Sequence, residues 1–225
     1  MDVKVLYEDK NLIVVVKPAG MPSQGDRSSA LDMVSYLKNY LRSSANGIPY
    51  VGVVHRLDRP VGGVMVYAKD QKTAADLSLQ VQKKQLCKMY KVVLTGTLKN
   101  KQGTLENYLL KDGKTNTSSV VSKNTPGAKP ARLNYKVMRT KYVDQEQLTL
   151  AEIELITGRH HQIRVQMADA GAGVYGDTKY NPVFQGKKGW FKMGLFSCRL
   201  EFKHPVTKEK MAFEYEPEEE PFDLI

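Results

Sequence analysis

Apolar and polar positions alternate over many short stretches of this chain, which predicts a fold rich in β-strands. Residues 3–7 and 12–16 form the first two stretches, and a polar turn separates them. The same pattern predicts further strands over residues 51–54, 64–68, 86–95, 131–139, 147–156, 195–202 and 211–215. Within 147–156 the apolar positions change phase, so we expect a bulge near Ala151 and Glu152.

Three segments have the spacing typical of helices. In the first, Ser29 is placed to cap a helix whose apolar side carries Leu31, Val34, Leu37 and Leu41. The second covers residues 73–84, with Lys83 and Lys84 in its last turn and with Ala74, Leu77 and Val81 facing inward. The third covers residues 161–170. Many hairpins and about three helices indicate an α+β fold with a mostly antiparallel sheet.

The length of 225 residues allows one large domain or two small lobes with a substantial core. We expect a single catalytic domain over residues 1–225. The acidic, proline-broken end over residues 216–225 is predicted to be a frayed tail.

A net charge of +10 and a pI near 9.4 favour a polyanionic partner. No apolar run approaches the roughly 20 residues of a spanning helix, and no helix concentrates a basic face suited to a membrane surface. The start of the chain does not resemble a secretory signal. Nucleic acid is therefore the better candidate partner, and we expect a monomeric protein.

The spacings of the cysteines, histidines and glycines do not indicate a metal site or a nucleotide cofactor. The two cysteines lack C-x-x-C spacing, which suits a reduced cytoplasmic compartment. The four histidines lack the accompanying residues of a metal site, and neither a Walker loop nor G-x-G-x-x-G occurs. We expect no metal and no nucleotide cofactor.

Residues 97–130 carry regularly spaced lysines between short strand-like pieces. Cations on mobile loops are typical of backbone contacts to RNA, so this segment is a candidate RNA grip. A solvated basic loop explains the same pattern. The sequence does not separate the two interpretations.

The most informative stretch is VGVVHRLDRPVGGVMVYAKD, residues 51–70. It places a charged loop between two apolar strands, and the loop holds Asp58 between Arg56 and Arg59. Nearby cations favour the ionised form of the carboxyl group. A surface hairpin with a salt bridge is the simpler interpretation of this pattern.

Four motifs, in the same order along the chain as in a known family, favour a catalytic role for this loop over a surface hairpin. His55-Arg56-Leu57-Asp58 resembles the HRLD signature of the RluA-type pseudouridine synthases, an RNA-uridine isomerase family. The remaining motifs resemble that family's opening motif, its K-x-Y strand and its T-G-R-x-H-Q-I-R-V-H segment: KPAG at 17–20, KMY at 88–90 and TGRHHQIRVQM at 157–167. Together the four motifs span most of the chain, which makes the resemblance specific.

The resemblance implies a pseudouridine synthase fold, with a bent sheet in two lobes, a cleft between them and a few flanking helices. It implies no redox step and no cofactor. Many members carry a small S4-like RNA-binding domain ahead of the first motif, for which we expect no room here. The substrate would be ribosomal or transfer RNA.

The resemblance also assigns roles. Asp58 is the catalytic aspartate, and Arg164 is expected to pair with it across the cleft floor. Tyr90 would stack on the target uracil, and Arg56 would help to fill the space of the everted nucleotide.

Further donors are expected to contact phosphate or ribose of the substrate: His55, Arg59, Arg159, His161, Gln162 and Lys17. Two departures from the family pattern stand out. Val61-Gly62 replace two hydroxyl residues after the HRLD loop, and Gln166 replaces a histidine. We expect these changes to affect hydrogen bonding around the site and substrate choice.

Two alternatives remain from other classes. A non-catalytic RNA-binding or ribosome-assembly protein on the same fold would also be basic, although it has no need of Asp58, Tyr90 and Arg164 together. A sugar hydrolase would need two carboxylates flanking the bond, and the Asp58 loop has one.

Overall fold

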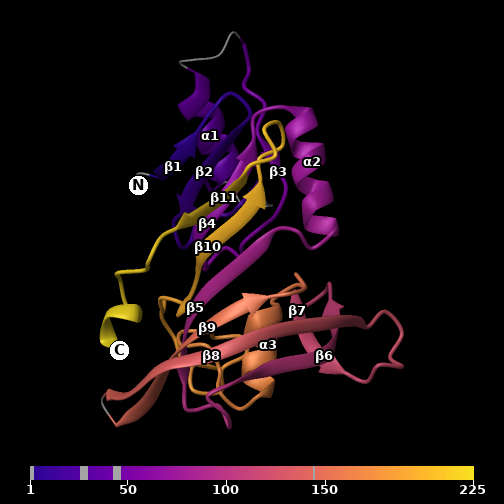
Figure 1. Cartoon of the computed structure of the whole chain (residues 1–225). Coiled ribbons are helices and arrows are strands. Elements are labelled where there is room, and N and C mark those ends of the chain that lie inside the picture. The colour runs from indigo at the N-terminus through magenta and orange to yellow at the C-terminus, as the bar shows by residue number, and fades with distance from the viewer. Residues whose placement is uncertain (1–2, 26–29, 43–46, 144) are drawn as a thin grey trace. The chain divides into compact units, whose positions relative to one another are not determined.

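A computed structural model describes residues 3–25, 30–42, 47–143 and 145–225 (Figure 1). Contacts within the chain divide it into two compact units. Unit 1 comprises Met1–Cys87 and Ser197–Glu216, and unit 2 comprises Lys88–Phe196 and Pro217–Ile225. The chain therefore leaves unit 1 at the start of one strand and returns to it within another.

Unit 1 is built on antiparallel strands. Its strand order is β1-β2-β4-β10, with β3 paired to β4 and β11 paired to β10. The elements are β1 (Lys4–Glu8), β2 (Leu12–Lys17), β3 (Gly52–Val53), β4 (Gly62–Ala68), β10 (Leu195–Lys203) and β11 (Lys210–Glu214). The predicted first hairpin is confirmed. Its turn is held by Asp9, whose Oδ1 accepts hydrogen bonds from the backbone N–H groups of Asn11 at 2.7 Å and Leu12 at 2.8 Å.

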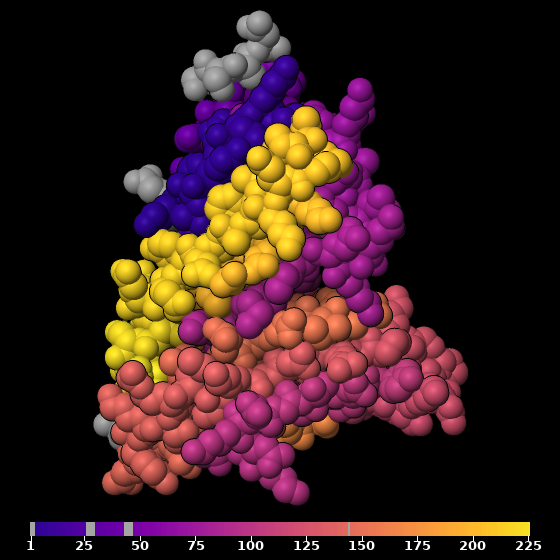
Figure 2. Space-filling model, viewed as in Figure 1, coloured from indigo at the N-terminus to yellow at the C-terminus, as the bar shows by residue number. Residues whose placement is uncertain are grey.

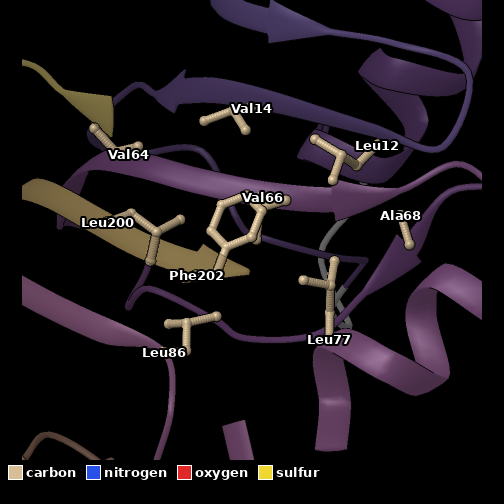
Figure 3. Close-up of a cluster of buried hydrophobic side chains, with 9 residues drawn as sticks. All are labelled: Leu12, Val14, Val64, Val66, Ala68, Leu77, Leu86, Leu200 and Phe202. Carbon is tan, nitrogen blue, oxygen red and sulfur yellow. The ribbon is translucent and has the colours of Figure 1, made fainter. Parts of the chain in front are cut away.

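The core of unit 1 lies between this sheet and α2 (Gln71–Gln82). Figure 3 shows the cluster, in which side chains from three strands meet the helix residue Leu77. The strand residues are Leu12, Val14, Val64, Val66, Ala68, Leu200 and Phe202, and Leu86 joins them from the segment before β5. All are buried, and burial of one such side chain contributes roughly 1.5–3 kcal/mol. This core fixes β4, the strand that follows the HRLD loop.

The edges of the unit 1 sheet come together. The rings of Tyr7 on β1 and Phe213 on β11 lie 5.6 Å apart, and the Lys4 ammonium lies 4.6 Å from the Tyr215 ring centre. In Figure 2 the indigo N-terminal strand and the gold segment that contains β11 lie side by side on the surface of unit 1. Side chains from the two edge strands thus pack against each other.

The first helix begins later than predicted. α1 runs over Met33–Leu41 and is capped by Asp32, whose Oδ1 accepts from the Val34 N–H at 2.9 Å. The predicted cap Ser29 lies outside the described residues. Leu31 was predicted to face inward and is 52% exposed, because it precedes the helix; Met33 is buried in its place.

The second helix ends earlier than predicted. Asp70 caps α2 through the Thr73 N–H at 2.8 Å, and Leu77 is buried as expected. The helix stops at Gln82, and Lys84 has a left-handed backbone with φ 55°. The two lysines therefore follow the helix and do not occupy its last turn.

Unit 2 contains a second run of antiparallel strands in the order β5-β9-β8-β6-β7. These are β5 (Cys87–Thr95), β6 (Gln102–Asp112), β7 (Thr117–Val121), β8 (Lys129–Val143) and β9 (Glu146–Leu155). Strands β6 and β7 form a hairpin within residues 97–130, the predicted lysine-rich segment. The six lysines of this segment are all exposed: Lys99, Lys101, Lys111, Lys114, Lys123 and Lys129.

The bulge in this sheet lies on β8, so the predicted strand was wrong. Val137 pairs with Ala151 and Arg139 pairs with Leu150, which leaves Met138 as the extra residue. The β5–β9 register runs through Ala151 and Glu152 without a shift. The change of phase in β9 has another cause: Leu148 packs in a cluster with Ile225, so β9 is buried on more than one face.

The C-terminal residues pack against unit 2, so the predicted frayed tail was also wrong. A short 3₁₀ helix, η2 (Phe222–Leu224), follows the acidic run. Ile225 is 8% exposed and joins Val93 and Leu148 in one apolar cluster. The apolar side chains at the end of the tail anchor it despite the acidic residues before them. The third helix, α3 (Gln162–Asp169), lies where predicted.

Candidate active site

In unit 1 the HRLD loop is held by the first motif. The Lys17 ammonium is fully buried and donates hydrogen bonds to the carbonyl oxygens of Pro18 at 2.9 Å, Met21 at 2.7 Å and Arg59 at 3.3 Å. The Gly20 N–H also donates to the Arg59 carbonyl at 2.8 Å. Two motifs that are 40 residues apart in sequence therefore form one structural element.

Lys17 was expected to contact the substrate, and the structure instead turns its ammonium inward. Burial lowers the pKa of Lys17 to about 7; the charge of Asp58 opposes this shift, and the charge of Arg59 adds to it. Asp58 is thus within electrostatic reach of a buried cation. We assign Lys17 to positioning the loop and not to phosphate binding.

Ser23 and His55 fix the loop from the other side. The Ser23 hydroxyl donates to the Leu57 carbonyl at 2.8 Å and accepts from the Leu57 N–H at 3.0 Å. His55 is 8% exposed, and its Nε2 accepts from the Val66 N–H of β4 at 3.2 Å. His55 therefore also holds the loop, and its expected contact with the substrate stays a prediction.

The three charged residues at the tip of the loop differ in exposure. Asp58 is half-buried, whereas Arg56 and Arg59 are exposed. The Arg59 Nε donates to the Gly20 carbonyl at 3.0 Å, and the Val61 N–H donates to the Asp58 carbonyl at 2.9 Å in a tight turn. The backbone of Asp58 is thus fixed while its carboxylate lies near the surface of the loop.

In unit 2 the buried Arg164 is held by an acidic residue that the sequence did not single out. Arg164 is 4% exposed, and its Nε and Nη2 donate to the two carboxylate oxygens of Asp177, each at 2.7 Å. Asp177 is fully buried. A buried guanidinium needs such a counter-charge because desolvation of an unpaired charge costs several kcal/mol.

Tyr180 completes the surroundings of this pair. The Arg164 guanidinium carbon lies 5.0 Å from the centre of the Tyr180 ring, within the range of a cation–π contact. The Asp177 Oδ1 accepts from the backbone N–H of Lys179 at 3.0 Å and of Tyr180 at 3.3 Å. An aspartate that closes a turn three residues before a tyrosine is a sequence signal, but it is common in loops. The buried arginine was the stronger hint that such a partner exists.

The side chains at the start of α3 and just before it form hydrogen bonds within unit 2. Gln162 is 3% exposed; its Oε1 accepts from the Thr157 hydroxyl at 2.8 Å and from the Arg159 N–H at 2.9 Å. His161 has φ 52°, and its Nδ1 lies 2.7 Å from the Tyr180 hydroxyl. Both side chains therefore organise the loop, and their contact with a substrate stays a prediction. Arg159 is half-buried, and its Nε donates to the Pro130 carbonyl at 2.9 Å.

Tyr90 lies on β5 opposite Ile153 of β9 and is 5% exposed. The structure thus brings Tyr90, Arg159, His161, Gln162 and Arg164 into unit 2. The remaining predicted site residues lie in unit 1: Lys17, His55, Arg56, Asp58 and Arg59. The pairing of Arg164 with Asp58 stays a prediction.

Three further observations concern metal ions, membranes and cavities. No group of three or more metal-binding side chains occurs in the described residues. No helix in the same ranges is long and apolar enough to cross a membrane. A groove of about 1060 Å³ runs along the start of α2, lined in part by Lys10, Tyr50 and Val206, and it contains none of the predicted site residues.

Comparison with known proteins decides the family. Residues 11–169 match the model of the RNA pseudouridylate synthase family, a range that contains the HRLD loop, Tyr90 and Arg164. The chain belongs to this family. Membership confirms the resemblance found in the motifs, the α+β pseudouridine synthase fold and the isomerase class of the reaction.

Relatives extend over nearly the whole chain. An uncharacterized RNA pseudouridine synthase of Bacillus subtilis, YhcT, is 32% identical over 95% of this chain and 68% of its own length. The ribosomal large subunit pseudouridine synthase D of Neisseria meningitidis is 33% identical over 95% of this chain and 58% of its own length. These names give no support to the alternative of a non-catalytic RNA-binding protein.

The fold is also that of a solved structure. The human RNA pseudouridylate synthase domain containing 1 protein superimposes with a TM-score of 0.77 at 20% identity, over 96% of this chain and 84% of that one. At this identity the likeness concerns the fold alone. It agrees with the two-lobed organisation that the motifs implied.

Proposed function

We propose that this chain converts uridine to pseudouridine in ribosomal RNA, with Asp58 as the catalytic carboxylate. The reaction breaks the N1–C1′ glycosidic bond, turns the detached uracil and forms a C5–C1′ bond. The proton leaves C5 and N1 gains one, so no oxidant or cofactor is required. A positioned carboxylate is the group that glycoside hydrolases use against a comparable bond.

One observation carries the proposal: the backbone on both sides of Asp58 is fixed by hydrogen bonds from the first motif and Ser23. Ser23 holds Leu57, and Lys17 and Gly20 hold Arg59. A catalytic group works best on a rigid support, because its orientation is then set before the substrate arrives. A surface salt bridge would need no such support.

The other site residues take roles that follow from their surroundings. Arg164 supplies a buried positive charge of fixed orientation, and Tyr90 offers a ring face and a hydroxyl to the uracil. Arg56, Arg59 and Arg159 contact phosphate or ribose through their remaining guanidinium N–H groups. The exposed lysines of residues 97–130, the segment that contains the β6–β7 hairpin, hold the RNA backbone.

Ribosomal RNA is preferred to transfer RNA because the related Neisseria enzyme is named for the large ribosomal subunit. We further propose that the enzyme acts in the cytoplasm as a monomer. The absence of C-x-x-C spacing supports a reduced compartment.

The test is pseudouridine mapping on defined substrates. Unmodified transcripts of the host's large-subunit ribosomal RNA and of its transfer RNAs are incubated with the purified protein, and pseudouridines are located by carbodiimide labelling and primer extension. We expect one or a few modified uridines in the ribosomal transcript. Modification of transfer RNA alone would contradict the substrate, and no modification of either would contradict the activity.

A further inference from the structure

Trp190 is the one tryptophan of the chain, and it lies on the surface of unit 2. Its side chain is 70% exposed, in a segment between Tyr180 and β10. Tryptophan is highly buried on average, and exposure of so large an aromatic surface to water is unfavourable. A ring left open in this way needs an explanation other than folding.

The segment that carries Trp190 is anchored at its base. Phe184 is 4% exposed, and its ring lies 4.8 Å from that of Tyr175 and 5.2 Å from that of Phe191. The buried Asn181 donates from Nδ2 to the Thr95 hydroxyl at 2.9 Å. Trp190 is therefore presented by a packed base and is not part of a loose end.

Two glycines shape the tip of the segment. Gly186 has φ 75° and Gly189 has φ 126°, conformations that other residues rarely adopt. The chain turns at both positions, and Trp190 directly follows the second. The backbone thus turns immediately before the exposed ring.

Cations accompany the ring. Lys187 and Lys188 are exposed, and the Lys187 ammonium lies 4.9 Å from the Phe184 ring centre. Lys192 is paired with Glu219 at 2.9 Å. Over the described part of the chain, neither Lys187 nor Lys188 is paired with a carboxylate. An exposed aromatic side chain close in sequence to two such lysines resembles the stacking platforms of proteins that bind single-stranded nucleic acid.

We propose that Trp190 stacks on an unpaired base of the RNA substrate, away from the target uridine, while Lys187 and Lys188 contact the adjacent phosphates. The inference rests on the proposed function in taking RNA as the ligand. A hydrophobic protein partner is the less suitable occupant, because lysine is depleted from the cores of protein interfaces.

Because Trp190 is the sole tryptophan, its fluorescence reports directly on this contact. The protein is titrated with a single-stranded oligoadenylate of twelve nucleotides and, separately, with a twelve-base-pair RNA duplex. We expect the single strand to quench the emission and the duplex to bind without comparable quenching, because its bases are already stacked. Equal quenching by both, or quenching by neither, would overturn the proposal.

Variants give the matching affinity test. Trp190→Ala is expected to weaken binding of the oligoadenylate by about 5- to 150-fold, and Trp190→Phe to retain most of the affinity. Tyr142→Ala removes another exposed aromatic, 69% exposed on β8, and is expected to change binding less than about twofold. Unchanged affinity of Trp190→Ala, or an equal loss in Tyr142→Ala, would contradict the assignment.

These readings do not depend on turnover. If the wild type modifies RNA and Trp190→Ala binds normally, the platform is wrong and the proposed function stands. If Trp190→Ala loses affinity and the wild type forms no pseudouridine, the proposed function is wrong and the stacking of Trp190 on RNA stands.

Discussion

Arg164 and Asp177 form a buried ion pair with two parallel hydrogen bonds, each 2.7 Å long. This geometry uses Nε and one Nη2 hydrogen and fixes the plane of the guanidinium. The direction of the whole guanidinium group is thereby set from the Asp177 side. Asp177 is therefore a positioning residue for the arginine that the HQIR motif supplies.

The first prediction concerns the stability of this pair. Asp177→Ala leaves a buried guanidinium without this counter-charge and is expected to lower the free energy of unfolding by about 3–5 kcal/mol. Urea denaturation measures the loss. Glu106→Ala is the control, because its pair with Arg132 is exposed and is worth at most about 1 kcal/mol. Similar losses in the two variants would show that the buried pair has no special weight.

The second prediction follows from the lowered pKa of Lys17. Between about pH 7 and its ordinary value of 10.5, the folded protein has released a proton that the unfolded chain retains. The free energy of unfolding therefore rises with pH in this window, by up to about 1.4 kcal/mol per pH unit from this group. Below pH 7 Lys17 is charged in both states, and its contribution is constant.

Urea denaturation between pH 7 and pH 9 tests this slope. Lys17→Met is expected to flatten it, whereas Lys129→Met, at an exposed lysine, is expected to keep the wild-type slope. Because the charge of Asp58 raises the pKa of Lys17 in the folded protein, Asp58→Asn is expected to move the lower end of the window to lower pH, while its upper end stays at 10.5. Identical slopes for the wild type and Lys17→Met would refute the titration of this buried group.

The third prediction concerns Gly63, where β4 begins after the HRLD loop. Its φ is 129°, and an added Cβ would lie 2.5 Å from the Ser197 nitrogen and 2.7 Å from its Cα. Gly63→Ala is expected to destabilise the protein by more than about 2 kcal/mol, from backbone strain and from collision with β10. At Gly20, with φ 87° and no atom within 4 Å, alanine meets strain alone, and we expect a loss of about 1 kcal/mol. Equal decreases in melting temperature for Gly63→Ala and Gly20→Ala would show that collision with β10 adds nothing to the backbone strain.

The sequence predicted strands and motifs well where local patterns decide them. The β1–β2 hairpin, the strands β8 and β9 and the helix α3 were predicted from alternation and spacing, and the four collinear motifs predicted the family. The position of Asp58 on a loop between two strands also followed from local pattern. These features depend on neighbours close in the chain.

Features that depend on distant neighbours were missed or misplaced. Phe222 and Ile225 were assigned to a frayed tail because their apolar cover, Val93 and Leu148, comes from other strands. Lys17 was predicted to contact phosphate or ribose of the substrate, because the sequence does not show that its ammonium reaches the Arg59 carbonyl, 42 residues away. Asp177 was not singled out, since a turn aspartate has no local mark that it faces a buried arginine.

The central claim is that Asp58 is the catalytic carboxylate, and single-turnover kinetics on an unmodified ribosomal RNA transcript that the wild type modifies tests it most directly. Asp58→Asn keeps the size of the side chain and removes its charge; Glu146→Gln makes the same change at an exposed residue as the control. We predict that Asp58→Asn binds the transcript like the wild type but forms pseudouridine roughly a thousandfold more slowly or not at all, whereas Glu146→Gln retains full activity. Wild-type rates of pseudouridine formation by Asp58→Asn would contradict the account.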